Sequence, residues 1–275
     1  MRFEIEKKDL IGILAKTQNI VEKRNTMPIL INVLIEASQN KITVFATDLE
    51  VSLIDSTVST VKESGKIAIN AKNLFDIIKE LGDGKIQFTK QENNWLEITQ
   101  KKSIFNIVGI AAEEYPVFPS YSTKEFITFS ALEMSDMIEK TIYSVSNDET
   151  RYHLNGVFFE YLADRNVPAY RMVATDGHRL SLVERERSAN VDAAFQDMGV
   201  IIPRKGLYEL KKILDNVDGE FQMAIEGAQL IVRHQTTVLM VRLIEGKYPN
   251  YQQLIPHNLS NHVMVHRESL LASLK

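Results

Sequence analysis

The chain has 275 residues, a length that predicts about two domains, each with a core of its own. Hydrophobic residues make up 44% and charged residues 25%, as in ordinary globular proteins, and no apolar run approaches the length of a membrane-spanning helix. A net charge of −4 argues against a simple basic nucleic-acid-binding protein, and the absence of cysteine excludes disulfides, thiol nucleophiles and cysteine-ligated metals.

Two features bear on the compartment in which the protein works. A chain without cysteine fits a reducing environment. Residues 1–8 alternate between apolar and polar side chains and then become charged, which is not the pattern of a secretory signal peptide. We therefore expect a cytoplasmic protein.

The first part of the chain predicts strands interrupted by two helices. Residues 2–6 alternate as a strand does, and 7–22 carry apolar residues at helical spacing. Those apolar residues are Leu10, Ile13, Leu14 and Val21. A second helix is predicted at 71–81, with Gly82 as its end. The remaining strands are expected at 29–36, 41–46, 49–61, 66–70, 85–90, 94–99 and 103–109.

The same order of elements then restarts. Residues 126–129 predict a strand and 131–145 a helix. The candidate core residues of this helix are Leu132, Met137, Ile138, Ile142 and Val145. Later segments repeat earlier ones at a period of roughly 125 to 135 residues, which is too long for a solenoid repeat. The matched segments are 155–160 with 32–36, 201–210 with 69–77, and Tyr248-Pro249 with Tyr115-Pro116.

This repetition predicts the fold class and the domains. Alternating strands without regular crossover helices favour an α+β fold, in which each domain packs two helices on antiparallel sheets. We expect one domain at 1–123 and a second at 124–257. Residues 258–275 resemble a strand followed by a helix, as at 2–14, and predict the opening of a third domain that the chain does not complete.

One stretch stands out within the repeat. Residues 174–180 read Ala-Thr-Asp-Gly-His-Arg-Leu, and Asp-Gly between two apolar runs is a strong hairpin signal because glycine accepts a positive φ. The run Ala-Thr-Asp recurs at 46–48. The second copy differs by a polar insert, Gly-His-Arg at 177–179, which suggests an added role for this copy.

Motifs of catalysis are scarce. No complete phosphate-binding loop, zinc-protease motif or nucleophile elbow is present. Asp176 and His178 are two residues apart and would share a face of a continuous strand, so a metal or acid–base site is one interpretation. The alternative is that Asp176 caps the turn while His178 lies on the surface. We expect no metal and no cofactor, because no second cluster has ligand spacing.

Positive charge is concentrated on particular segments of this acidic chain. Residues 7–24 carry a net charge of +3, and 203–212 carry +3 as well. The other two predicted helices are not basic. Sparse lysine and arginine side chains facing phosphates would give weak contacts independent of sequence, whereas the alternative is ordinary solvated helix faces. The hairpin at 174–180 is open to two interpretations too, a peptide-binding patch or a plain turn.

Several longer strings are similar to one known family. They are Arg-Tyr-His-Leu-Asn-Gly at 151–156, Val-Ala-Thr-Asp-Gly-His-Arg-Leu at 173–180 and Val-Ile-Ile-Pro-Arg-Lys-Gly at 200–206. Shorter strings at 27–30, 47–50 and 248–251 agree. Together they closely resemble the beta subunits of bacterial DNA polymerase III, the sliding clamps, in the same order along the whole chain.

The resemblance implies a function that is not enzymatic. Members of this family have three similar domains and close head to tail into a dimeric ring around duplex DNA, where they tether the replicative polymerase as processivity factors. By position, the family's DNA contacts would fall on Arg24, Lys72, Tyr152 and His153. A ring that holds DNA topologically needs mobility rather than tight contact, which suits an acidic protein with basic inner helices.

The resemblance also implies partner surfaces. The family binds short linear motifs of the polymerase alpha subunit, the clamp loader and repair polymerases in a groove between its second and third domains. The matching positions are Leu154, Thr175, Gly177, His178, Arg179, Leu180, Pro249 and Leu254. The ring would close through an edge strand around Ile104, Phe105 and Ile107. Since the family's partner surface lies in the third domain, we expect a full-length homodimer and a 275-residue chain that is monomeric or irregularly associated.

Two rival functions remain open at this point. One is a metal-dependent hydrolase that uses Asp176 and His178. The other is a peptide-binding scaffold that has no role on DNA.

Overall fold

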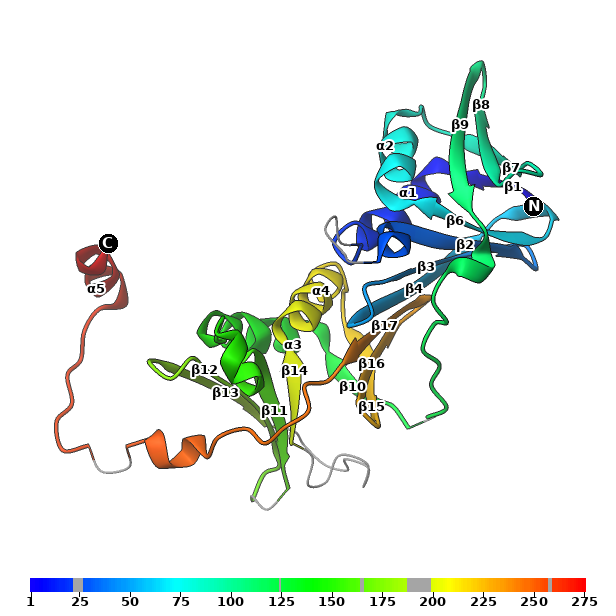
Figure 1. Ribbon diagram of the computed structural model, residues 1–275. Coiled ribbons are helices and arrows are strands. Elements are labelled where there is room, and N and C mark those ends of the chain that lie inside the picture. Colours follow the sequence, from blue (N-terminus) through cyan, green and yellow to red (C-terminus); the bar gives the residue numbers. More distant parts are fainter. Residues whose placement is uncertain (22–26, 124, 164–165, 187–198, 257–258) are drawn as a thin grey trace.

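The chain folds into two successive units that repeat one order of elements (Figure 1). The computed structural model describes residues 1–275 apart from 22–26, 124, 164–165, 187–198 and 257–258. The first unit consists of β1 (Arg2–Glu6), α1 (Lys7–Thr17), β2 (Asn32–Ser38), β3 (Lys41–Thr47), β4 (Val51–Val58), β5 (Thr60–Glu63), β6 (Gly65–Asn70), α2 (Ala71–Glu80), β7 (Lys85–Lys90), β8 (Trp95–Gln100) and β9 (Ser103–Ile110).

The second unit follows the same order, except that its described residues include no strand equivalent to β5. It consists of β10 (Ile127–Ser130), α3 (Ala131–Glu139), β11 (Gly156–Leu162), β12 (Ala169–Thr175), β13 (Leu180–Glu186), β14 (Gly199–Pro203), α4 (Arg204–Leu214), β15 (Glu220–Glu226), β16 (Gln229–His234) and β17 (Thr237–Arg242). Short 3-10 helices lie at η1 (Pro28–Ile31), η2 (Ala112–Glu114), η3 (Ile142–Ser144), η4 (Glu149–Leu154) and η6 (Tyr251–Leu254). Helices and antiparallel strands in this order confirm the α+β class.

A continuous antiparallel sheet joins the two units. Among the described residues its order is β10-β15-β16-β17-β4-β3-β2-β6-β9-β8-β7-β1-β5. The units meet where β4 pairs with β17, with Val51 opposite Val241 and Ile54 opposite Val238. A smaller sheet of order β13-β12-β11-β14 belongs to the second unit alone. The backbone hydrogen bonds of one sheet therefore fix how the units sit relative to each other.

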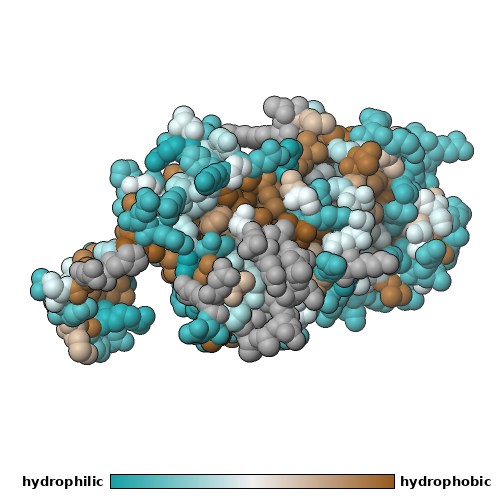
Figure 2. Space-filling model, turned by 90° about the horizontal axis from the view of Figure 1, so that it is seen from below, coloured by the Kyte–Doolittle hydropathy of each residue, from teal (hydrophilic) through white to brown (hydrophobic). Residues whose placement is uncertain are grey.

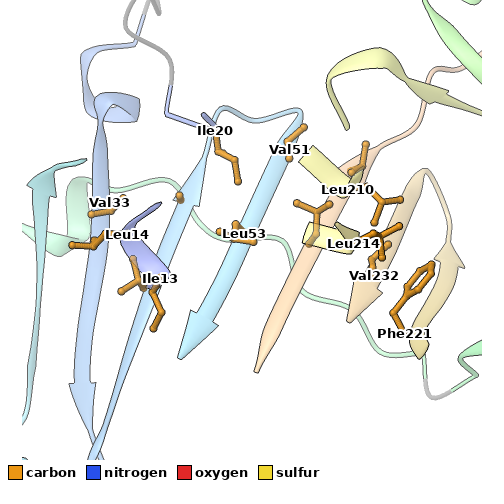
Figure 3. Packing of buried hydrophobic residues seen from close by; sticks show 14 of the residues in the cluster. Ile13, Leu14, Ile20, Val33, Val51, Leu53, Leu210, Leu214, Phe221 and Val232 are labelled. Atoms are coloured by element: carbon orange, nitrogen blue, oxygen red, sulfur yellow. The ribbon is translucent and has the colours of Figure 1, made fainter. Parts of the chain in front are cut away.

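The helices α1 to α4 lie in a row along one side of the long sheet (Figure 1). α1 packs beside α2, and α3 beside α4. Their apolar faces, including Leu14 of α1 and Leu210 of α4, are fully or almost fully buried. Figure 3 shows such side chains from both units over the joined sheet, so that apolar packing continues across the junction.

Capping residues fix the start of two helices. The side chain of Asn70 accepts a hydrogen bond from the backbone N–H of Asn73 at 2.9 Å at the start of α2. Ser130 does the same for Glu133 at the start of α3, at 3.3 Å. Both residue types are preferred at this position because they satisfy a backbone donor that has no partner inside the helix.

The predicted first helix, 7–22, is too long. α1 ends at Thr17, whose hydroxyl donates a hydrogen bond to the Leu14 carbonyl at 2.8 Å. The chain then turns, with the Ile20 N–H bonded to the Thr17 carbonyl at 3.1 Å. Ile20 is buried although it follows the helix, so apolar spacing alone does not mark where the helix stops.

Three further expectations are wrong in detail. The strand expected at 29–36 begins as the 3-10 helix η1, because Pro28 fixes its own φ near the helical value. The helix expected at 131–145 ends at Glu139, and Leu132 is 81% exposed, on the side of α3 away from the core. No strand forms at 262–266, although α5 (Arg267–Leu274) follows as expected.

The C-terminal segment lies apart from both units. α5 and the described residues from 259 onward are exposed, and Figure 2 shows them as a separate lobe with hydrophilic and hydrophobic side chains. In the part of the chain that the structure describes, no helix is both long and apolar enough to cross a membrane.

Candidate functional site

The turn at 175–180 is held by its own threonine and aspartate. Thr175 pairs with Leu180 across the hairpin of β12 and β13. The carboxylate of Asp176 accepts hydrogen bonds from the backbone N–H groups of His178 at 2.9 Å and Arg179 at 3.0 Å. Gly177 has φ +91°, which glycine adopts without strain. Asp176 thus caps the turn, and the hairpin prediction is confirmed.

Asp176 is poorly suited to catalysis. The N–H groups of His178 and Arg179, with the Arg179 guanidinium at 3.0 Å, lower the pKa of the Asp176 carboxyl to about 2. A carboxylate of such low pKa is a weak base, and its oxygens are already in use. Within the described ranges, no group of three or more histidine, aspartate or glutamate residues is placed to hold a metal ion.

The first unit repeats the two backbone hydrogen bonds by which the aspartate caps this turn. The Asp48 carboxylate accepts from the backbone N–H groups of Glu50 at 2.9 Å and Val51 at 2.6 Å. Thr47 pairs with Ser52, five residues apart as Thr175 and Leu180 are. Leu49 takes the place of Gly177, with φ +78°. The expected polar insert is therefore wrong: residues 177–179 replace residues 49–51 in a loop of the same length.

A second chain segment packs against the 175–180 turn. The backbone N–H of Thr175 donates to the Tyr248 hydroxyl at 3.1 Å, and the Tyr248 ring stacks on Phe158 with centroids 5.0 Å apart. Burial raises the pKa of Tyr248 to about 12, so the phenol stays protonated at neutral pH. Because Pro249 directly follows Tyr248, the contacts of Tyr248 position Pro249 beside the hairpin.

A buried charge cluster holds the end of the same segment. The Arg171 side chain is 7% exposed and pairs with Glu160 at 3.2 Å and with Glu184. The Tyr251 hydroxyl accepts a hydrogen bond from Arg171 and donates one to Glu160. Sequence reasoning missed these anchors. The repeated Tyr-Pro pair at 115 and 248 was the available signal, but it does not reveal the distant residues that each tyrosine meets.

The structure brings the expected groove residues into one neighbourhood. Leu154 is buried in an apolar cluster with Tyr248 and Tyr251, and Leu180 packs against that cluster. Thr175 is also buried. The exposed members are Gly177, His178, Arg179, Pro249 and Leu254. The arrangement is an apolar cluster to which both the hairpin and the 248–254 segment contribute, with the exposed members on those two segments.

Arg179 has a defined position at the hairpin tip. Its guanidinium donates to the Tyr143 carbonyl at 2.6 Å and lies 5.7 Å from the centre of the Tyr143 ring. The side chain remains 58% exposed. A cation held over an aromatic ring and open to solvent is suited to meeting an anionic or aromatic group of a partner.

The expected DNA contacts lie in both units. Lys72 is exposed in the first turn of α2. Tyr152, 57% exposed, and His153 are neighbours on η4, with ring centroids 5.7 Å apart. Arg24 lies outside the described residues. The structure places Tyr152 beside His153 and leaves Lys72 on the other unit.

Net charge along a helix overstates the free positive charge. On α4, Lys211 pairs with Asp215 at 3.0 Å, Lys212 with Glu209 at 2.7 Å, and Lys205 with Asp48 of the first unit. On α1, Lys16 pairs with buried Asp55 at 2.7 Å.

Arg204 differs from these lysines. It contacts the Asn147 amide and lies 5.5 Å from the centre of the Tyr208 ring. Among the described residues of α4, Arg204 therefore offers positive charge that no carboxylate neutralises.

One strand edge of the first unit is open. β9 pairs with β8 from Ser103 to Val108, but with β6 only at Gly109 and Ile110. Ile104 is 61% and Phe105 37% exposed, and Ile107 is half-buried. An exposed apolar edge strand is a ready template for pairing with another chain.

The comparisons with known proteins agree along the chain. Residues 1–119 match the family described as DNA polymerase III beta subunit, N-terminal domain, and residues 128–250 match its central domain. The beta sliding clamp of Caulobacter vibrioides (strain NA1000 / CB15N) is 31% identical over 261 residues, which cover 94% of this chain and 69% of the relative. The beta sliding clamp of Vibrio cholerae serotype O1 is 30% identical over 271 residues, which cover 98% of this chain and 72% of the relative.

Solved structures give the same picture. The structure titled Caulobacter crescentus pol III beta has a TM-score of 0.88 at 30% identity, covering 94% of this chain and 70% of that chain. A sliding clamp (DNA polymerase III subunit beta) from Bartonella birtlesii bound to griselimycin has a TM-score of 0.86 at 32% identity. The match covers 93% of this chain and 68% of that chain.

Proposed function

The chain belongs to the family of DNA polymerase III beta subunits, the bacterial sliding clamps, and from this premise we propose which of its residues meet DNA and partner proteins. The protein is a DNA sliding clamp of the replicative polymerase and is not an enzyme. The hydrolase and the scaffold without a DNA role are not favoured.

The proposed DNA surface consists of Arg24, Lys72, Tyr152 and His153. The observation that supports it is the exposure of Lys72 and Tyr152 in a protein whose Lys16 and α4 lysines are engaged with carboxylates. A few free cations give contacts that depend on salt and not on sequence. Such contacts suit duplex DNA that must slide past the protein.

The proposed peptide groove is formed by the 175–180 hairpin and the 248–254 segment. Its supporting observation is the fixed spacing of the two, set by the Thr175–Tyr248 hydrogen bond of 3.1 Å above an apolar base. A concave apolar base with a few polar groups at its rim is the usual form of a site for a short linear motif. The proposed partners are the polymerase alpha subunit, the clamp loader and repair polymerases.

The assembly is proposed in the same terms. The domains are 1–123 and 124–257, with 258–275 as the opening of a third. In the full-length homodimer, the edge of β9 around Ile104, Phe105 and Ile107 meets a neighbouring subunit. Its unpaired backbone groups and exposed apolar side chains support this role. The proposed location is the cytoplasm, where replicative polymerases act.

The test of clamp action is retention of the full-length protein on DNA of different topology. A clamp stays on closed circular plasmid and leaves once the plasmid is cut, because it holds DNA by encirclement. Equal loss from circular and linear DNA would contradict encirclement.

The groove has its own test. His178→Ala combined with Arg179→Ala weakens binding of a polymerase-tail peptide about tenfold, as expected for loss of charge-assisted contacts, while the melting temperature stays unchanged. Unchanged affinity would remove this site from the proposal.

A further inference from the structure

A cavity of about 280 Å³ lies at the junction of the two units, outside the site described above. The first unit lines it with Leu49 of the 47–52 turn and with Val117 and Pro119 of the segment after β9. The second unit lines it with Met240 and Arg242 of β17. We call this cavity the junction pocket.

The junction pocket is built as the 175–180 groove is. In each unit, an aspartate-capped turn with a positive φ at its third residue faces a Tyr-Pro segment. The Tyr248 hydroxyl accepts a hydrogen bond from the Thr175 backbone N–H, whereas the Tyr115 hydroxyl donates to the Asn32 carbonyl at 3.2 Å. The junction pocket also has a third wall, because β17 of the second unit closes one side of it.

Leu49 is an unexplained feature of this pocket. Its φ of +78° is a left-handed conformation that costs a residue with a Cβ free energy, and glycine occupies the equivalent position 177. The side chain is nevertheless apolar and 52% exposed, and Val117 across the pocket is 98% exposed. Packing inside the described chain accounts for neither, and strained residues of this kind collect at binding sites.

The charges at the rim indicate what the pocket takes. Arg242 and Glu50 are exposed residues of its lining, and neither side chain has an ion pair among the described residues. Their backbones are joined, because the Arg242 backbone N–H donates to the Glu50 backbone carbonyl at 2.8 Å. The volume admits one or two apolar side chains rather than a long peptide. A short peptide with an apolar side chain next to a carboxylate complements Leu49, Met240 and Arg242.

We propose that the junction pocket is a second docking site for short peptides, which presents apolar walls to a leucine- or phenylalanine-sized side chain and Arg242 to a neighbouring carboxylate. The proposal rests on the peptide groove proposed for 175–180, whose architecture it shares. It assigns the pocket a ligand of the same class at a separate place on the clamp.

Methyl NMR of the chain labelled at leucine and methionine methyl groups tests both sites in one titration. The probe is N-acetyl-Leu-Phe with a free carboxylate. Met240 and Leu49 report on the junction pocket, whereas Leu180 and Leu254 report on the groove. Saturable shifts at Met240 are expected, and capping the probe as its amide weakens them about tenfold, because the bond to Arg242 is lost.

Variants assign the response to the pocket. Arg242→Gln weakens the Met240 response about tenfold, as the amide probe does. Leu49→Gly removes the apolar wall while keeping a residue that accepts the positive φ, and it abolishes saturation at Met240. Arg179→Ala, the matched control in the groove, leaves the Met240 response unchanged.

The outcomes separate the two proposals. Shifts at Leu180 and Leu254 with none at Met240 overturn the junction pocket and leave the groove standing. Shifts at Met240 alone support the pocket and count against the groove. A Met240 response that survives both Leu49→Gly and Arg242→Gln overturns the pocket as its source, and silence at all four methyl groups overturns both sites.

Discussion

The turns at 47–52 and 175–180 have the same backbone frame but different surroundings. Each is capped by an aspartate after a threonine, and each holds its third residue at positive φ. Val51 of the first turn is fully buried and pairs with Val241 of the second unit. Arg179, the equivalent residue of the second turn, is 58% exposed. Four changed residues thus separate a turn that joins two units from one that we propose to face a partner.

The two aspartates provide the largest expected difference. The Asp48 side chain is 3% exposed and pairs with Lys205 across the junction, whereas that of Asp176 is 22% exposed. We expect Asp48→Ala to lower the free energy of unfolding by about 3 kcal/mol, because it leaves Lys205 without its buried partner. Asp176→Ala should lower it much less. If urea unfolding showed the same loss of unfolding free energy in both variants, the ion pair across the junction would add no stability beyond that of the shared turn.

The third residue of the turn sharpens the comparison. Gly177→Leu should lower the free energy of unfolding by about 1 to 2 kcal/mol, since a leucine pays for the left-handed conformation. A Cβ at this position would also lie 2.8 Å from the Arg151 guanidinium, which must move. The matched control, Leu49→Gly, relieves the same strain and should not lower thermal stability. A Gly177→Leu protein as stable as the wild type would mean that the frame carries no strain.

The repeat itself and most element types follow from the sequence, because apolar spacing and the Thr-Asp echo are local signals. No such local signal marks the end of α1, because the Thr17 hydroxyl bonds back to the Leu14 carbonyl while Ile20 remains buried beyond the helix. Ion pairs between residues far apart in the sequence could not be predicted either. Lys205 was expected to add free positive charge to its helix. In the structure it instead forms an ion pair with Asp48, which is far away in the sequence.

Acid should weaken the exposed turn. The pKa of Asp176 is lowered to about 2 by the N–H groups of His178 and Arg179, below its value of roughly 3.9 in an unfolded chain. Its contribution is therefore present above pH ~4 and is lost as the pH falls toward ~2. The stability gap between wild type and Asp176→Asn should narrow over this range in denaturant unfolding. A gap that stays constant would mean that the carboxylate does not hold the turn.

The smallest expected effect concerns DNA. Lys72→Ala and Arg24→Ala should each lower DNA affinity modestly and equally for all sequences, and reduce the salt slope of binding by about 1. Lys211→Ala is the matched control, because Lys211 is paired with Asp215 at 3.0 Å and should contribute little. A sequence-dependent loss, or an equal loss in the control, would contradict contact through free cations.

The central claim is that the two turns share one backbone conformation and that their side chains decide their roles. The most direct test is to place the side chains of the first turn on the second. The triple variant Gly177→Leu, His178→Glu and Arg179→Val carries the residues of 49–51 at 177–179, and its affinity for a polymerase-tail peptide is measured by calorimetry. We expect a folded protein that has lost peptide binding at the groove. A folded variant that binds the peptide as tightly as the wild type would contradict the account.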